Sequence, residues 1–151
     1  MLEPVVTRIE VPCGLPRAYD VFVQGMGNWW PLHKRAMSMR TGTPARRLEV
    51  DPRIGGKIVE IGGDGTEYHW GTFRSLQPPD FAAFDFHMGM PAEQASLVEV
   101  RFVPLAPDRT EVTLTQSNWE AFGDLADMLR GSYGSSWGMI LDEGYAKACA
   151  G

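Results

Sequence analysis

The stretch GTFRSLQPPDFAAFDF, residues 71–86, predicts two antiparallel strands joined by a tight turn. Its centre, Gln77-Pro78-Pro79-Asp80, carries proline and aspartate, which favour turns. Antiparallel pairing across this turn sets residues of one strand directly opposite residues of the other. The expected pairs, of which the last two share one face, are Leu76 with Phe81, Phe73 with Phe84, and Gly71 with Phe86.

The glycine of the last pair predicts that the sheet curves. A glycine opposite a bulky aromatic side chain leaves room for that side chain and permits the strand to bend. In each of the next two strands, alternate residues lie on one face of the sheet, and these residues extend the face formed by the hairpin. These residues are Val98, Val100 and Phe102 in one strand and Val112, Leu114 and Gln116 in the other. We therefore expect a curved sheet with an apolar concave side.

A succession of strands is expected from residue 47 to residue 117. Short breaks with glycine, proline and aspartate separate the strands and supply the turns. Parallel neighbours need long crossover connections, so links this short predict an antiparallel meander. The expected strands are 47–50, 57–61, 68–76, 81–88, 97–105 and 110–117.

The N-terminal third predicts one strand, two short helices and a loop. Val5 to Val11 alternates with period two, which is typical of a strand. Pro16 suits the first turn of a helix that places Ala18, Tyr19, Phe22 and Val23 on one face. A second short helix or turn is expected before Pro31. Residues 32–46 show no periodicity and are expected to form a loop that covers the mouth of a cavity.

The C-terminal part predicts a helix that is interrupted before it ends. Ser117 and Glu120 have the spacing of a capping box, so we expect a helix to begin there. The glycine- and serine-rich stretch 131–136 is a poor helix interior and predicts a break or kink. A final helix is expected from about residue 135 to residue 150, with an apolar stripe facing the sheet. The stripe consists of Trp137, Ile140, Leu141, Tyr145 and Ala148.

This order of elements is that of the helix-grip fold, and several short motifs occur in it at matching places. The motifs are Trp29-Trp30-Pro31, Gly55-Gly56, Gly71-Thr72-Phe73, Pro78-Pro79, Phe84-Asp85-Phe86, Val98-Glu99-Val100-Arg101-Phe102, Thr110-Glu111-Val112-Thr113-Leu114, and Tyr133 with Ser136-Trp137. Together they resemble the START-like (SRPBCC) superfamily, and within it the domain named after the activator of Hsp90 ATPase homologue 1. One departure is Ser136, which stands where that family usually has glycine.

The resemblance implies an architecture but no catalytic set. It implies a single α+β domain over residues 1–151, with the helix-grip (START-like or Bet v1-like) fold. In this fold a curved antiparallel sheet wraps around a long C-terminal helix, and two short helices follow the first strand. It also implies a cavity between sheet and helix. Because fold does not determine function, the function has to be argued from the residues that line the cavity.

Composition and charge exclude several classes of partner. The chain has 151 residues and a formal net charge of -5, and its basic residues are scattered apart from Arg40, Arg46 and Arg47. We therefore expect no nucleic acid partner. No apolar run approaches the roughly 18 to 20 residues that span a bilayer, and the N-terminus lacks the pattern of a signal peptide. A cytoplasmic protein without a membrane span is expected.

The cysteines and histidines predict no metal and no cofactor. Cys13 and Cys149 form no ligand cluster and are expected to be free packing residues. In the register above, His69 and His87 lie on opposite faces of the sheet, although a slip of one residue would set them side by side. The chain shows no nucleophile with a base, no carboxylate pair and no metal cluster at diagnostic spacing.

The expected ligand site is the apolar space between the sheet and the last helix. Tyr133, Trp137 and Leu141 are spaced by four and lie on one helical face, whereas the phenylalanines alternate along the strands. Met88, Met90 and Met139 are the better pocket candidates among the eight methionines, and Gln116, His69 and Tyr133 are polar groups able to orient a ligand. The candidate site residues are Trp29, Trp30, Phe73, Phe84, Phe86, Met88, Phe102, Gln116, Tyr133, Trp137 and Leu141.

The function expected from these residues is binding of a small hydrophobic, ring-containing molecule without turnover. One alternative is a cyclase-type or other small-molecule enzyme that uses the same cavity, and a buried, strongly shifted His69 or a paired Glu99 would favour it. Another is a chaperone-associated interaction module, although the family's co-chaperones carry a further N-terminal domain that is not expected here. A homodimer remains an option. Replacing Trp137 by alanine would separate a cavity wall from packed core.

Overall fold

The computed structural model describes residues 2–38, 42–88 and 90–151 and shows one curled antiparallel sheet that holds a long C-terminal helix. All seven strands form this sheet in the order β1-β7-β6-β5-β4-β3-β2. Each strand of the meander lies beside the next, as the short links require. The strands are β1 (Val5–Val11), β2 (Arg47–Val50), β3 (Lys57–Ile61), β4 (Glu67–Gln77), β5 (Phe81–Phe86), β6 (Ser96–Ala106) and β7 (Arg109–Ser117). The helix-grip architecture predicted from the sequence is confirmed.

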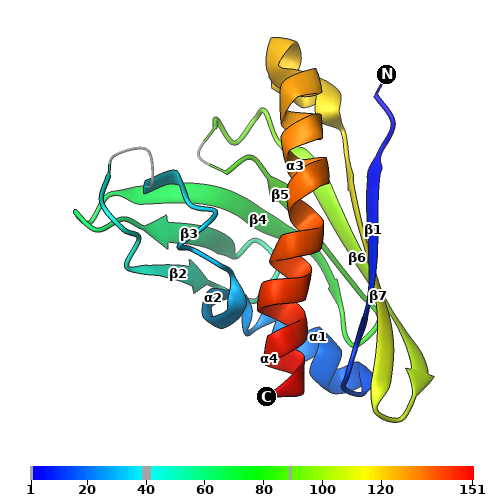
Figure 1. The fold of residues 1–151 in the computed structure, drawn as a ribbon. Coiled ribbons are helices and arrows are strands. Elements are labelled where there is room, and N and C mark those ends of the chain that lie inside the picture. The colour runs from blue at the N-terminus through cyan, green and yellow to red at the C-terminus, as the bar shows by residue number, and fades with distance from the viewer. Residues whose placement is uncertain (1, 39–41, 89) are drawn as a thin grey trace.

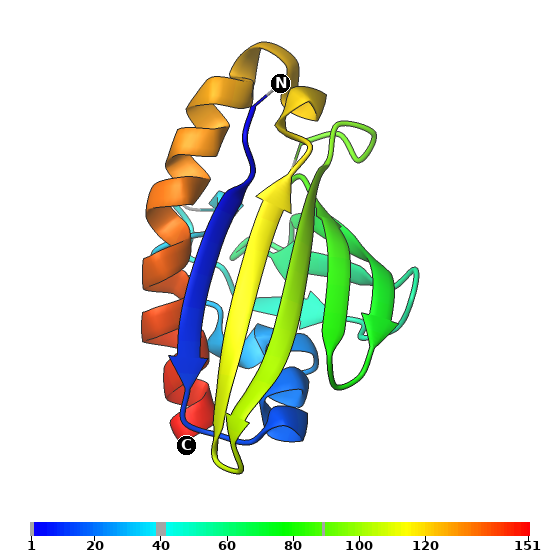
Figure 2. The same ribbon diagram turned by 90° about the vertical axis from the view of Figure 1, so that its right-hand side faces the viewer.

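The helices form a layer on the concave side of the sheet (Figure 1). The long C-terminal helix crosses the sheet, and its C-terminal end lies near the short helices that follow β1. Figure 2, turned by 90°, shows this helix and the short helices on the same side of the sheet. The helices are α1 (Leu15–Val23), α2 (Met26–Trp29), η2 (Trp119–Leu125), α3 (Ala126–Ile140), η3 (Leu141–Tyr145) and α4 (Ala146–Ala150). No helix among these described residues is long and apolar enough to cross a membrane.

The register of the β4–β5 hairpin confirms two of the three predicted pairs. Gly71 pairs with Phe86, and Phe73 pairs with Phe84. A Cβ atom added to Gly71 would lie 1.9 Å from the Asp85 carbonyl oxygen, so only glycine allows the strands to approach this closely. The pair of Leu76 with Phe81 is wrong, because Leu76 pairs with Ala82. The turn closes one residue later than predicted, and a register shift between Phe73 and Ser75 absorbs the difference.

The C-terminal helix passes through the stretch that predicted a break. Residues 131–136 lie inside α3, so this prediction is wrong. The Ser135 and Ser136 hydroxyls donate hydrogen bonds to the Ser132 carbonyl, which satisfies these polar groups within the helix. A Cβ atom added to Gly134 would lie 3.6 Å from a methyl group of Val5, which is an ordinary contact distance, so β1 passes close to the helix here. The interruptions lie elsewhere, at Gly123 and in the π-helical turn η3.

The predicted capping box at Ser117 and Glu120 is also wrong. The helix that begins here is the 3₁₀-helix η2, and its N-cap is Asn118, which has a left-handed backbone with φ of 64° and makes no side-chain cap. Glu120 instead accepts a hydrogen bond from the Leu2 backbone amide. Its carboxylate therefore attaches the N-terminal segment to η2. The spacing of three residues alone did not distinguish a helix cap from this contact with Leu2.

One core cluster fills the space between the sheet and the helices. It runs from Val11 in β1 to Cys149 in α4 and includes the predicted helical stripe at Trp137, Ile140, Leu141 and Tyr145. The inward residues of β6 and β7 are buried as predicted. A second, smaller cluster of Trp119, Phe122 and Ala126 fills the end of the sheet under η2.

Candidate functional site

A cavity of about 370 Å³ opens between α3, the segment from Trp30 to Met37, and the end of β5. Its walls are mostly apolar and contain two aromatic residues and four methionines. Cavities of this size and composition are typical of small-molecule sites. Its described lining consists of Trp30, Lys34, Arg35, Ala36, Met37, His87, Met88, Met90, Leu125, Met128, Leu129, Ser132, Tyr133, Ser136 and Ile140.

The helical wall comes from one face of α3 and the end of η2. Residues spaced by three or four positions lie one above the other on a helix, so they form a continuous strip toward the cavity. The strip begins with Leu125 and Met128, both exposed, at the outer end. It ends with Ser136 and Ile140, both buried, at the inner end. The small side chains of Ser132 and Ser136 on this face leave room for the cavity.

The second wall is the segment between α2 and β2, and buried polar contacts fix its position. The Trp30 indole nitrogen Nε1 donates to the Arg35 carbonyl at 2.8 Å. Glu60 of β3 is fully buried, and its carboxylate accepts from the Met37 amide at 2.7 Å and the Ser38 amide at 2.9 Å. It also accepts from the Trp70 indole at 3.1 Å. These charge-assisted bonds attach the wall to the sheet. The predicted covering loop 32–46 thus borders the cavity at its described start, whereas its residues 39–41 lie outside the described residues.

The third wall is the end of β5, which stops at Phe86, two residues earlier than predicted. The amides of His87 and Met88 both donate to the Trp70 carbonyl, at 2.8 and 3.0 Å, so normal pairing ends there. Met88 has a positive φ of 44°, which ends the extended backbone. The Tyr133 hydroxyl donates to the Met88 sulfur at 3.7 Å across the cavity. The early end of β5 therefore places Met88 on the cavity wall.

His69 and His87 lie in ring contact, with centroids 4.6 Å apart and planes at 84°. The prediction that they lie on opposite faces is wrong, because the β3–β4 ladder shifts by one residue at Trp70. His87 Nδ1 donates to the Met90 carbonyl at 2.8 Å, which leaves its buried Nε2 without a hydrogen-bond partner among the described residues. Burial, followed by the neighbouring His69, lowers the pKa of His87. No group of three or more metal ligands occurs among the described residues.

The aromatic floor of the cavity is held by a buried polar relay. Trp137 is 1% exposed, and its indole Nε1 donates to the Gln116 side-chain oxygen at 2.8 Å. Gln116 donates to the Ser96 hydroxyl at 2.8 Å, and Ser96 donates to the Phe86 carbonyl at 2.6 Å. Each polar group of this relay is buried and has a partner, so the relay fixes the Trp137 ring against the sheet.

The structure places the predicted site residues at three depths. Trp30, Met88 and Tyr133 line the cavity. Phe86, Trp137 and Gln116 lie directly beneath, because the Phe86 and Trp137 rings contact Trp30 and Tyr133 and Gln116 holds Trp137. The remaining predicted residues are buried in the core and are absent from the cavity lining, namely Trp29, Phe73, Phe84, Phe102 and Leu141.

Sequence reasoning missed the polar and flexible part of the lining. Arg35, Met37 and Met128 are lining residues that the aromatic pattern did not indicate. A signal existed for Met128 and Ser132, because they lie on the same helical face as Tyr133 and Ser136 once the helix begins at Ala126. The predicted break at 131–136 concealed that face. No periodic signal marks Arg35 or Met37, which lie in an irregular segment.

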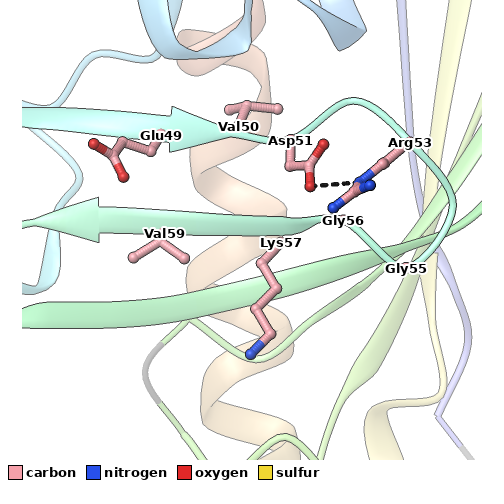
Figure 3. A pocket seen from close by; sticks show the side chains of 8 residues that line it. All are labelled: Glu49, Val50, Asp51, Arg53, Gly55, Gly56, Lys57 and Val59. Carbon is pink, nitrogen blue, oxygen red and sulfur yellow. Dashed lines mark hydrogen bonds and ion pairs between the residues drawn. The ribbon is translucent and has the colours of Figure 1, made fainter.

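A second hollow, of about 460 Å³, lies on the β2–β3 hairpin (Figure 3). Its charged lining includes Glu49, Asp51, Arg53 and Lys57, and Arg53 forms an ion pair with Asp51 at 2.8 Å. Arg53 is an exposed side chain of the turn, and the lining contains no aromatic residue. The cavity beside α3 combines aromatic walls with partial enclosure, and we therefore regard it as the candidate site.

The two cysteines lie at the opposite end of the core from the cavity mouth. Both are buried and free of disulfide bonds. Burial, together with the adjacent Cys13 thiol, raises the pKa of Cys149 to about 12. A thiol with a raised pKa is a poor nucleophile, and this agrees with a packing role.

The sequence profile of one family, described as activator of Hsp90 ATPase homolog 1-like protein, matches residues 17–143. No curated protein matches the chain at a significant level. Among solved structures, the chain is similar to the anthrahydroquino-Gama-pyrone synthase Txn09, with 23% identity, a TM-score of 0.68 and coverage of 97% of both chains.

Two further structures share the fold at low sequence identity. The self-sacrificing resistance protein CalC from Micromonospora echinospora has 23% identity and a TM-score of 0.70, with 97% of this chain and 93% of that chain covered. The Aha1 dimer from Colwellia psychrerythraea has 14% identity and a TM-score of 0.61, with 97% of this chain and 99% of that chain covered. At these identities the likeness shows the fold alone.

Proposed function

This chain belongs to the family of activator of Hsp90 ATPase homolog 1-like proteins, and within that family we propose that it binds a small hydrophobic, ring-containing molecule without turnover. The cavity beside α3 is the proposed site. We further propose that residues 1–151 act as one domain, because a single main core cluster connects β1, the short helices, the sheet and α4.

The observation that carries the proposal is the chemistry of the cavity walls. Trp30 and Tyr133 offer aromatic surfaces, and Met37, Met88, Met90 and Met128 surround them. Methionine side chains are flexible and polarizable, and their sulfur atoms make favourable contacts with aromatic rings. A volume of about 370 Å³ is at the small end of the range for ligand pockets, so a ring compound of modest size fits it.

Binding without turnover is preferred over the enzyme alternative because of the position of the His87 side chain. The lowered pKa of His87 is the feature that an enzyme would use. A general base must, however, come within hydrogen-bond reach of the substrate. His87 Nε2 is covered by protein atoms, and Nδ1 is already bound to the Met90 carbonyl. Neither nitrogen therefore faces the cavity as a free base.

The exposed hydrophobic residues give no support to the chaperone-module alternative in the part of the chain that the structure describes. Large hydrophobic residues that are exposed there are distributed over separate elements. They are Val6, Ile54, Val103, Leu105, Leu125 and Met128. Leu125 and Met128 belong to the cavity mouth. The other four residues lie on β1, on β6 and between β2 and β3, away from η2 and α3 in the chain. An interaction surface would require a larger continuous area.

The test is titration with the neutral fluorescent probe N-phenyl-1-naphthylamine, with two matched variants. Ser132→Phe fills the cavity from the exposed face of α3, whereas Ser135→Phe places the same side chain on that helix outside the lining. We expect one binding site in the wild type and in Ser135→Phe, and a loss of at least about tenfold in affinity in Ser132→Phe. Equal affinity in both variants, or no binding to the wild type, would contradict the proposal. If the titration supports the proposal, native mass spectrometry of the purified protein would identify a copurifying ligand.

A further inference from the structure

We propose that the ligand is an aromatic acid, with a carboxylate, sulfonate or similar anionic group beside its ring, and that Arg35 binds this group at the cavity mouth. The inference rests on the proposed function, because it assigns a ligand class to the same cavity. It goes beyond that function by stating a charge and a residue that recognises it.

The first observation is the charge of the cavity lining. The whole chain is acidic, with a formal net charge of -5. The lining nevertheless contains Lys34 and Arg35, and no aspartate or glutamate among the described residues. In the whole chain, acidic side chains outnumber basic ones, with 19 of aspartate and glutamate and 14 of lysine and arginine. The charged side chains that line the cavity in the described residues are cationic, which favours an anionic group at its mouth.

The second observation is that the two cations differ in their partners. Lys34 forms an ion pair with Glu143 at 2.9 Å, so its charge is already balanced. Arg35 forms no ion pair with a carboxylate among the described residues. Four other arginines within the described residues do, namely Arg47, Arg53, Arg74 and Arg109. Arg35 thus leaves an unbalanced positive charge at the mouth.

The third observation is that the Arg35 guanidinium is held in place by neutral acceptors. Its Nε donates to the Ser136 hydroxyl at 3.2 Å, and Nη1 donates to the Lys34 carbonyl at 3.0 Å. Ser136 in turn donates to the Ser132 carbonyl at 2.7 Å, which directs its lone pairs toward Arg35. A guanidinium has five N–H donors, so these bonds position the group and leave donors for an anion.

The backbone of Arg35 is fixed as well. Its carbonyl accepts from the indole of Trp30, which is an aromatic wall of the cavity. The backbone of Arg35 is therefore attached to the ring-binding surface, and both side chains line the same cavity. A ring that packs on Trp30 shares this cavity with the Arg35 side chain. This arrangement selects a ring that carries an acidic substituent over a neutral ring.

The expected gain from the charge is moderate. Arg35 is an exposed residue, so solvent and salt screen its attraction for an anion. Taking a surface ion pair as about 1 kcal/mol, the anionic group should improve affinity by about fivefold. The gain should shrink as salt is added, whereas affinity for a neutral ring should not.

The experiment compares two probes that differ only in an acidic group. 8-Anilinonaphthalene-1-sulfonate is N-phenyl-1-naphthylamine with an added sulfonate, and both report binding by fluorescence. We expect the sulfonate to bind the wild type about fivefold more tightly at low salt. Arg35→Gln should remove this difference, so that the two probes bind the variant with similar affinity. Arg101→Gln removes the same charge from a strand position outside the cavity. The difference in affinity between the two probes should persist in this variant.

The possible results separate the two proposals. If neither probe binds the wild type, the proposed function fails. If the neutral probe binds at the cavity but the sulfonate binds no more tightly, only the present inference is overturned. A tighter sulfonate whose advantage survives in Arg35→Gln also overturns it, because another group then recognises the anion. Urea denaturation of each variant confirms that it is folded during the titrations.

Discussion

Aromatic side chains gather at both ends of the space beneath the C-terminal helix, yet they form packed core at one end and border a cavity at the other. At the closed end, near α1 and α4, Phe22 contacts the rings of Trp29, Phe102 and Tyr145. At the open end, Trp30 and Tyr133 face a cavity of about 370 Å³. Figure 1 shows that one continuous helical rod spans both ends. Aromatic content alone therefore does not distinguish a core from a binding site.

The difference lies in the partners of the aromatic side chains. At the closed end the Tyr145 hydroxyl donates to the Ala18 carbonyl at 2.7 Å, and a Cβ atom added to Gly144 would lie 2.4 Å from the Trp29 carbonyl. The C-terminal helix is thus in direct contact with the short helices α1 and α2. At the open end, serines and flexible methionines occupy the facing positions, and the Tyr133 hydroxyl donates to a methionine sulfur. Small and flexible neighbours are what keep that end hollow.

The largest effect is expected from removing an aromatic ring at the closed end. Phe22 is 1% exposed and packs against three aromatic rings. Phe22→Ala should lower the free energy of unfolding by about 3 to 5 kcal/mol, because the solid core cannot collapse around the lost ring. Urea denaturation measures this change. Affinity for the neutral probe should be unchanged, and a weaker probe affinity would show that the two ends are not separate.

The boundary between the two ends is Trp137, whose ring lies between core and cavity floor. Trp137→Phe keeps an aromatic ring but removes the indole donor, so the buried Gln116 oxygen loses its partner. This should lower the free energy of unfolding by about 1 to 3 kcal/mol. A matched change, Trp119→Phe, removes an indole nitrogen that has no hydrogen-bond partner among the described residues, and it should cost less. An equal cost for both would show that ring size, not the relay, matters.

Glu60→Gln tests the attachment of the cavity wall to the sheet. The Glu60 carboxylate accepts from the amides of Met37 and Ser38, one on each oxygen. A glutamine would set its own N–H₂ group against one of these amides, which should lower the free energy of unfolding by about 1 to 3 kcal/mol. The wall that contains Met37 should also loosen, so probe affinity should fall. Loss of stability with full probe affinity would separate Glu60 from the cavity.

The closed end and most of the architecture were predictable from the sequence. The alternation in the strands and the spacing of Trp137, Leu141 and Tyr145 indicate which face of each element is buried. The buried faces of the sheet and the helix pack against each other, so this pattern predicts the architecture. The cavity was less predictable because its shape depends on local irregularities. The shift at Trp70, the early end of β5 and the fixed position of Arg35 all arise from hydrogen bonds between distant segments. Single-residue register shifts leave no periodic signal.

The pH dependence of stability tests His87 at the open end. Burial lowers the pKa of His87 in the folded state below its ordinary value of 6.5. As the pH falls below about 6.5, the unfolded chain binds a proton that the folded protein does not, so stability decreases. The contribution of one proton cannot exceed about 1.4 kcal/mol per pH unit. Thermal unfolding of wild type and His87→Gln from pH 7 to pH 5 should therefore show a smaller acid-side loss in the variant. Parallel profiles would assign the loss to other groups.

The smallest effect on stability is expected at the rim, from Met128→Ala. Met128 is 61% exposed on α3 and lies at the cavity mouth, so its removal should change the free energy of unfolding by less than about 0.5 kcal/mol. Alanine is also a good helix former, which limits any loss. The side chain nevertheless covers part of a bound ring, and affinity for the neutral probe should fall by about two- to fivefold.

Val103→Ala is the matched control, because Val103 is 48% exposed on β6 and lies outside the lining. It removes apolar surface of similar exposure without touching the site, so its probe affinity should equal that of the wild type. If both variants bind the probe as the wild type does, Met128 makes no contact with the ligand and the open end is shallower than its lining indicates. A loss in Met128→Ala alone, at unchanged stability, would show that Met128 contributes to binding and not to the stability of the fold.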